Sequence, residues 1–420
     1  MAPLGGDFSA KVAQANDRII CGSSVDAVKT LPMGRILARR LRIPFFQRRY
    51  CWSEPQWATL LRDVEACGGA GHALGRLTCA VEADGRLLVI DGQQRSTTCA
   101  LLLAAVRDAP AADGALHARI NNVLFPDGGA LARWRASKGG AAAEIGDGEA
   151  LDFAAVVPTH CDRAAFYEAV LPRGARAATS AWRRPAEAKA YFLDALARKS
   201  AAELGHLCDA IVDGLTWLLF PIRAGEGRAD GTEDLFVIFE RLARRDATFC
   251  RPGRAAEYAS LGPADFARNR VLGSFGSERR AERVYEEAWL PIERAAADAA
   301  GPSRAAGAVL EAMLAAFLAR EAPAPPPRRR APPPSVVGGA LYARFTRLMD
   351  DVLAAATDDA ARERATRGLL RRLRAFAEAH FAGADDRPVA PAAAADALRE
   401  DDEFEFPAPA PRRPSPRAVS

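Results

Sequence analysis

Long apolar runs are missing from this 420-residue chain. No stretch of about 18 or more uncharged apolar residues occurs, so no transmembrane helix is predicted. The N-terminus "MAPLGGDFSAKVAQAND" lacks the basic start and apolar core of a secretory signal peptide. We therefore expect a cytoplasmic protein without a membrane partner. A hydrophobic fraction of 49% is still enough for a sizeable core and two or three domains.

Closely spaced metal-ligand and disulfide patterns are also missing. The eight cysteines are spread along the chain without a CxxC pair, and the five histidines are equally scattered. This spacing predicts neither a zinc site nor a disulfide framework. It is typical of thiols in a reducing compartment.

Lysine is scarce, with five occurrences among the 57 basic residues, so arginine supplies nearly all the positive charge. The net charge of +4 is too small to indicate a nucleic-acid partner by itself. The excess of arginine, alanine and proline is typical of a GC-rich coding bias. Arginine clusters therefore carry an argument only where their surroundings support it.

Apolar spacing predicts an α+β protein. Residues 31–41 are expected as a short helix, and residues 42–52 as extended chain because Pro44 disfavours the α region at the residue before it. Ser53 is the expected N-cap of the next helix. The stretch 75–90 predicts a β-hairpin with Asp84-Gly85 at its turn. A further strand is expected at 215–224, and helices at 184–200, 201–214, 231–245, 278–300, 340–356 and 365–381.

The segment "LLVIDGQQRSTTCALLLAAV" predicts a strand ending at Ile90 and a helix beginning near Ser96. Free N–H groups and the dipole at a helix N-terminus favour an anion. Gly92 allows a positive φ, and Arg95 offers a fork for phosphate oxygens. Thr97 and Thr98 could add hydroxyl donors or hold a metal, while Asp91 could bind Mg²⁺ and Gln94 could position a water.

The same residues have a purely structural interpretation. Asp-Gly is a common turn, and Ser, Thr and Asp are common helix caps. The phosphate loop G-x-x-x-x-G-K-[ST] is absent from the sequence, so this is not an ordinary P-loop NTPase.

A second polar cluster, Gln47, Arg48, Arg49 and Tyr50, follows the apolar "IPFF". Arginine and aromatic residues interleaved in an extended segment could stack on bases or bind phosphates. Alternatively, the aromatic residues are core and the arginines lie in solvent.

Taken in order, "IPFFQRRYCWSEPQWATLLRDV", "HALGRLT" and "VIDGQQRSTT" resemble the N-terminal domain of GmrSD-type Type IV restriction enzymes. A weaker similarity follows in "EDLFVIFERLARR" and in "GPADFARNRVL", which resembles the family's Asp-x-x-x-Asn segment. The family usually has Asn and Gly where this chain has Ala243 and Asp246. The resemblance spans roughly residues 31–300 and is strongest before residue 110.

The resemblance implies a ParB/sulfiredoxin-like core and a nucleotide site at DGQQR. On that basis Asp91, Gln94 and Arg95 are the expected catalytic residues, with Arg95 on phosphates, Asp91 on a metal or water and Gln94 on the attacking water. Nucleotide contacts are expected from Gln47, Arg48, Gly92, Gln93, Thr97 and Thr98. Nucleic-acid contacts are expected from Arg49 and Tyr50. The implied cofactors are an NTP and Mg²⁺, and Arg95→Ala is expected to abolish turnover without unfolding the protein.

The implied organisation has a leader at 1–30, a ParB-like core at 31–110 and a helical continuation at 111–300. A helical region at 301–405 is interrupted by a proline-rich linker at 322–334, and residues 406–420 form a disordered tail. Fused family members carry a C-terminal HNH nuclease. The one histidine after His206 is His380, on an expected helix, so no HNH site is assigned and a separate nuclease is an expected partner.

Three functions compete at this point. The leading one is an NTP-binding and NTP-hydrolysing regulatory component of a system that restricts modified phage DNA. The alternative is a non-catalytic DNA-binding or protein-interaction module that keeps the fold without turnover. A third, a nuclease in its own right, lacks a carboxylate cluster with two-metal spacing.

Overall fold

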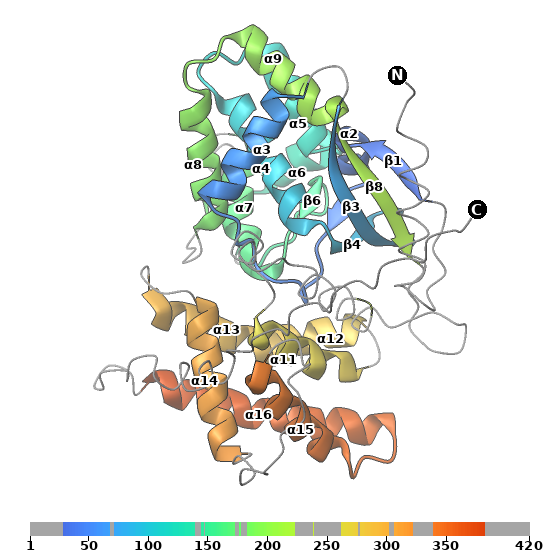
Figure 1. Cartoon of the computed structure of the whole chain (residues 1–420), viewed down its shortest axis with the longest axis vertical. Coiled ribbons are helices and arrows are strands. Elements are labelled where there is room, and N and C mark those ends of the chain that lie inside the picture. The colour runs from blue at the N-terminus through green and yellow to red at the C-terminus, as the bar shows by residue number, and fades with distance from the viewer. Residues whose placement is uncertain are drawn as a thin grey trace, which may run out of the picture.

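The computed structural model describes residues 28–67, 71–138, 144–146, 148–172, 176–177, 183–222, 238, 262–275, 278–301, 306–321 and 339–382. A six-stranded mixed sheet runs through its upper half (Figure 1). Its strands, from one edge to the other, are β1 (Lys29–Pro32), β8 (Leu215–Ile222), β3 (His72–Val81), β4 (Leu87–Asp91), β2 (Leu41–Arg42) and β6 (Val156–Val157).

Two of the five strand pairings are antiparallel, β1 with β8 and β3 with β4, and the other three are parallel. A separate two-stranded sheet pairs β5 (Glu144–Ile145) with β7 (Arg176–Ala177). The α+β class expected from the sequence is confirmed.

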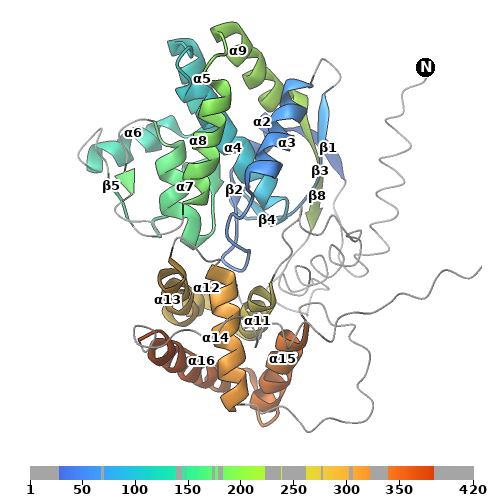
Figure 2. The same cartoon turned by 60° about the vertical axis from the view of Figure 1, so that its left-hand side comes forward.

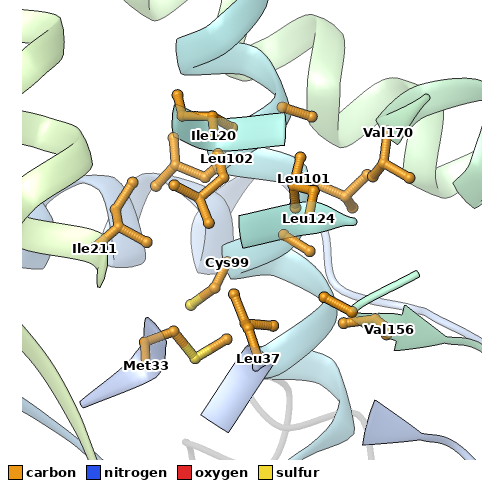
Figure 3. Close-up of a cluster of buried hydrophobic side chains, with 14 of the residues drawn as sticks. Met33, Leu37, Cys99, Leu101, Leu102, Ile120, Leu124, Val156, Val170 and Ile211 are labelled. Atoms are coloured by element: carbon orange, nitrogen blue, oxygen red, sulfur yellow. The ribbon is translucent and has the colours of Figure 1, made fainter. Parts of the chain in front are cut away.

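A layer of helices covers one face of the large sheet (Figures 1 and 2). Its members are α2 (Met33–Leu37), α3 (Glu54–Glu65), α4 (Gln93–Asp108), α5 (Gly114–Leu124), α6 (Gly128–Ser137), η1 (His160–Asp162), α7 (Arg163–Val170), α8 (Arg184–Leu196), α9 (Ala201–Asp209) and η2 (Ala210–Gly214). Helix α4 is central to this layer, because every one of its residues except Arg95 is buried. Cys99, Leu101 and Leu102 of α4 meet side chains from several other elements in one apolar cluster (Figure 3).

The lower half is helical (Figure 1). It contains α11 (Pro263–Leu272), η4 (Gly273–Phe275), α12 (Glu278–Val284), η5 (Tyr285–Trp289), α13 (Leu290–Ala300), α14 (Ala306–Glu321), α15 (Gly339–Leu353) and α16 (Asp359–Ala382). These helices build a second apolar core.

Strand β4 contributes to both cores. Successive side chains of a strand point to opposite faces. Leu87 and Val89 accordingly join the first core, while Leu88 and Ile90 join the second. The sheet therefore has an apolar layer on each face, which accounts for the unbroken hydrophobic run "LLVI".

The β-hairpin and the strand near residue 215 are confirmed as β3–β4 and β8. Helix α3 begins after Ser53 as expected, and the Gln56 side chain accepts a hydrogen bond from the Ser53 N–H (2.9 Å). The predicted helix 31–41 is wrong. Leu31 pairs with Trp217 in the sheet, and this long-range pairing overrides the helical spacing, leaving only the short α2.

Three further differences concern the same region. Helix α4 begins at Gln93 rather than near Ser96. Of residues 42–52, only Arg42 lies in a strand, and a turn follows in which the Gln47 N–H donates to the Pro44 carbonyl (3.0 Å). The sheet also takes in β8, so it extends beyond the expected core at 31–110.

The expected leader, proline-rich linker and tail, and the positions Ala243 and Asp246, lie outside the described residues. Within the part of the chain that is described, no helix has both the length and the apolar character needed to cross a membrane.

Candidate functional site

Residues 45–52, here called the site loop, lie between the two halves of the molecule. The loop follows β2 and reaches down from the sheet towards the lower helices (Figure 2). Phe45 and Phe46 belong to the lower core, whereas Tyr50 belongs to the upper one. The loop is therefore fixed at both ends by apolar packing.

The DGQQR motif braces the site loop through its two glutamines. The Gln93 Nε2 donates to the Arg48 carbonyl (3.1 Å), and the Gln94 Nε2 donates to the Arg49 carbonyl (3.0 Å). The Gln94 Oε1 accepts from the Cys51 N–H (2.9 Å) and also from the next N–H along (3.3 Å). With both lone-pair directions of Oε1 in use, Gln94 is committed to the loop backbone rather than to an attacking water.

Gly92 sits at the joint between β4 and α4, with a φ of +111°. A Cβ at this position would lie 2.8 Å from Leu77 Cδ1 and 3.3 Å from the Trp217 ring. The Gly92 carbonyl accepts hydrogen bonds from the Ser96 N–H (3.1 Å) and Oγ (3.0 Å). Backbone conformation and packing both require glycine at this position, independently of any ligand.

Gln47 and Tyr50 point inward from the site loop. The Gln47 Nε2 donates to the Ile90 carbonyl (2.6 Å). The Tyr50 hydroxyl lies 2.8 Å from Thr98 Oγ1 and accepts from Trp57 Nε1 (2.8 Å). Tyr50 is only 2% exposed, and burial raises the pKa of its hydroxyl. Both side chains are part of the core, and the expected contacts of Tyr50 with nucleic acid and of Thr98 with nucleotide stay predictions.

Arg95 braces strand β3. Its Nη1 donates to the Leu74 carbonyl (2.5 Å) and its Nη2 to the Arg76 carbonyl (3.1 Å), on either side of Gly75. Gly75 has a φ of +93° and marks a bulge in the β3–β8 pairing. The guanidinium also stacks 4.8 Å from the centre of the Trp217 ring. These carbonyls occupy the fork of Arg95 in the ligand-free structure, and its expected role on phosphates stays a prediction.

Asp91 is paired with two cations. Its Oδ2 lies 3.3 Å from Arg76 Nη2, and its Oδ1 lies 3.8 Å from Arg95 Nη2. Over the described ranges, no group of three or more His, Cys, Asp or Glu side chains is arranged to hold a metal ion. Both Asp91 oxygens thus face arginines of the protein itself, and the expected Mg²⁺ stays a prediction. Thr97 is buried on the first turn of α4.

Helix α11 holds the site loop from below. The Arg268 Nη2 donates to the Phe46 carbonyl (2.7 Å), and its Nη1 donates to Glu293 Oε1 (2.9 Å). Burial alone would lower the pKa of Arg268, but the carboxylates of Asp265 and Glu293 raise it. The sequence segment resembling the family's Asp-x-x-x-Asn motif is thus brought against the "IPFFQRRYCW" segment.

Arg49 also points into the protein. Its Nη2 donates to Cys161 Sγ (3.4 Å), and Cys161 Sγ in turn lies 3.7 Å from Glu293 Oε2. Burial alone would lower the pKa of Arg49, while Cys161 and Glu293 raise it. Burial raises the pKa of the Cys161 thiol to about 11, so the thiol is neutral. The Arg49 guanidinium lies in this buried network, and its expected contact with nucleic acid stays a prediction.

Three polar atoms around the loop have no hydrogen-bond partner within the described parts of the chain: Arg48 Nη1, Asp162 Oδ1 and Asn269 Nδ2. The other Asp162 oxygen accepts from the Tyr50 N–H (2.7 Å) and from Thr159 Oγ1 (2.8 Å). Burial raises the pKa of Asp162 to about 6. Buried polar atoms are paired in most proteins, so an unpaired set beside one loop indicates a place where a ligand or water binds.

Of the sequence-predicted residues, the structure brings the two motifs together: Gln93 of α4 supports Arg48, and Gln94 supports Arg49. It leaves Asp91 and Arg95 on the far side of the joint, facing β3. Asp162 was missed by the sequence reasoning, and Arg268 was given no role although it lies within "GPADFARNRVL". Their contacts are with chain segments 112 and 222 residues away, which local spacing does not reveal.

Fold and site together define a mixed α+β domain in which a strand-to-helix joint braces a polar loop. The family model for the GmrSD restriction endonuclease, N-terminal domain, matches residues 33–206. Over these residues the chain is similar to the N-terminal domain of a GmrSD restriction endonuclease. No curated protein matches the chain.

Proposed function

We propose that the protein is an NTP-binding regulatory component of a DNA-targeting restriction system, with its nucleotide site at the site loop. The observation that carries the proposal is the buried Arg48 Nη1, which has no hydrogen-bond partner in the described structure. This donor stays unpaired although Gln93 and Gln94 hold the backbone carbonyls of Arg48 and of the residue after it.

A phosphate oxygen is the chemical group that suits this position. Leaving a buried donor unpaired costs about 1–3 kcal/mol, and more for a charged group. An anionic oxygen at Nη1 would recover that free energy through a charge-assisted hydrogen bond. Because the loop is braced before the ligand arrives, little conformational entropy is lost on binding.

Hydrolysis in this proposal depends on Asp162 rather than on DGQQR. Its Oδ1 is unpaired, and its pKa of about 6 lets it accept a proton from water near neutral pH. Gln94 and Arg95 contribute by positioning: Gln94 holds the loop, and Arg95 holds strand β3.

The test is a calorimetric binding panel of ATP, GTP, CTP and UTP on wild type, Arg48→Met and Arg48→Lys. Losing one charge-assisted hydrogen bond of about 1.5–3 kcal/mol should weaken binding roughly 10- to 100-fold in Arg48→Met. The nucleotide affinity of Arg48→Lys should lie between those of wild type and Arg48→Met. Arg35→Met, at an exposed arginine of α2, serves as the matched control and should bind like wild type. The proposal fails if wild type binds none of the four nucleotides, or if Arg48→Met binds as tightly as wild type.

A second candidate is a DNA-binding or protein-interaction module without turnover. It is supported by the hydrogen bonds that the Gln94 and Arg95 side chains make to backbone groups of the protein itself. Phosphate release, measured with each nucleotide in the presence and absence of modified DNA, separates the two. Release that depends on Asp162 supports the hydrolase, whereas nucleotide or DNA binding with no release supports the module. In either case a separate nuclease subunit is the partner that the chain would regulate.

A further inference from the structure

We propose that the ligand site is shared between the two halves of the molecule, with Asn269 of α11 supplying its second wall. This inference rests on the proposed function and extends the site beyond residues 33–206, the segment that matches the GmrSD-type domain. The ligand class is a nucleotide that Arg48 and Asp162 contact from the upper half and Asn269 contacts from below.

The placement follows from contacts made by the neighbours of Asn269. Arg268, next to it in sequence, donates to the carbonyl of Phe46 in the site loop (2.7 Å). Asp265, one helical turn earlier, shares a face of α11 with Asn269. Burial raises the pKa of the Cys51 thiol in the loop, the Arg48 charge lowers it, and the charges of Asp162 and Asp265 raise it further. The α11 face that carries Asp265 and Asn269 is therefore turned towards the same part of the loop as Arg48 and Asp162.

The side-chain amide of Asn269 is buried and lacks a hydrogen-bond partner for its N–H donor among the described residues. The residue is 5% exposed, and its Oδ1 receives only a long hydrogen bond from Arg268 Nε (3.4 Å), while its Nδ2 has no partner among the described residues. A buried amide N–H group without a hydrogen-bond partner destabilises the ligand-free protein. An apolar residue of similar size, such as leucine, would avoid that cost.

The donors and the acceptor match one kind of ligand. Arg48 Nη1 and Asn269 Nδ2 can donate to phosphate or carbonyl oxygens, whereas Asp162 Oδ1 can accept from a hydroxyl or a ring N–H. A nucleotide carries both types of group on one molecule. A ligand that spans these three residues would join the sheet half to the helical half and would reduce their relative motion.

The experiment compares Asn269→Leu with wild type in two measurements, nucleotide affinity by calorimetry and the midpoint of thermal unfolding without ligand. The probes are the same four nucleoside triphosphates. We expect at least a tenfold loss of affinity, together with an unfolding midpoint that is equal to or above that of wild type. A residue with a purely structural role would give the opposite pattern, a lower midpoint and unchanged affinity.

Asn121→Leu is the matched control. The Asn121 Oδ1 accepts from Arg107 Nη1 (3.0 Å) in a separate buried cluster, so leucine there should lower the midpoint and leave affinity unchanged. Asn269→Asp keeps the shape but replaces the donor with a charged oxygen, and it too should lose affinity. This variant tests the idea even if Asn269→Leu does not fold.

The outcomes separate this inference from the proposed function. If Arg48→Met loses affinity but both Asn269 variants bind like wild type, the shared site is refuted and the nucleotide site at the loop stands. If wild type binds no nucleotide, both are refuted.

Discussion

Replacing Arg95 by methionine should destabilise the sheet rather than remove a phosphate ligand. The variant loses two charge-assisted hydrogen bonds to the Leu74 and Arg76 carbonyls, at 2.5 and 3.1 Å. It also loses the contact with the Trp217 ring at 4.8 Å. Each hydrogen bond from a charged donor contributes about 1.5–3 kcal/mol, and an exposed cation–π contact about 0.5–1 kcal/mol.

Partial exposure reduces these values. The Arg95 side chain is 28% exposed, and its ion pair with Asp91 is long, at 3.8 Å. Water can replace part of what is lost, and the long ion pair adds little. We therefore expect a loss of about 3 kcal/mol in the free energy of unfolding, or a midpoint lower by roughly 3–5 °C for a chain of this size.

The assay is thermal unfolding followed by circular dichroism, together with nucleotide binding well below the midpoint. Arg35→Met is again the control, and its effect should stay within about 0.5 kcal/mol. Nucleotide affinity of Arg95→Met should remain within about threefold of wild type, since its guanidinium faces β3 and not the site loop. Wild-type stability combined with lost nucleotide binding would refute this reasoning and restore Arg95 as a phosphate ligand.

Two further predictions concern a titration and a backbone conformation. The pKa of Asp162 is raised to about 6 in the folded protein, from an ordinary 3.8. Between about pH 4 and pH 6 the folded state therefore holds a proton that the unfolded state has released. The free energy of unfolding that this protonation contributes is fully present below pH 4 and is lost as the pH rises through about 6. Urea unfolding should show Asp162→Asn gaining stability over wild type across that window, by about 2–3 kcal/mol, and a constant difference from pH 4 to 7 would contradict the assignment. Gly92→Ala should cost about 2–4 kcal/mol, because φ of +111° is strained for alanine and its Cβ would lie 2.8 Å from Leu77. An unfolding midpoint like that of wild type in Gly92→Ala would show that the joint can relax.

The sequence predicted correctly those elements that are determined by a few neighbouring residues. The Asp84-Gly85 turn, the Ser53 cap and the strand before DGQQR needed only neighbouring residues. Residues 31–41 were misjudged because β1 is held by β8, which lies more than 180 residues later. Helical spacing there could not reveal a pairing partner so far along the chain.

The proximity of the two motifs was predicted from the sequence, whereas the chemical roles of their residues stay predictions. Residue types suggested that Arg95 binds a phosphate and that Gln94 holds a water. An arginine fork binds backbone carbonyls with the same donors that it offers to phosphate, so type and spacing could not distinguish the two. Only the bulge at Gly75 and the position of the site loop decide between them. The ParB-like ancestry of the core stays a prediction.

The alternating side chains of β4 have a consequence for anyone who shortens this protein. Leu88 and Ile90 face the helices beyond residue 262, as do Ala80 and Ile222. A fragment ending at residue 222 would keep every strand of the large sheet but would expose this apolar surface to water. Such a fragment should self-associate or precipitate unless polar residues replace these four. The helical half therefore acts as a solubilising cover for the sheet, in addition to any part it has in binding.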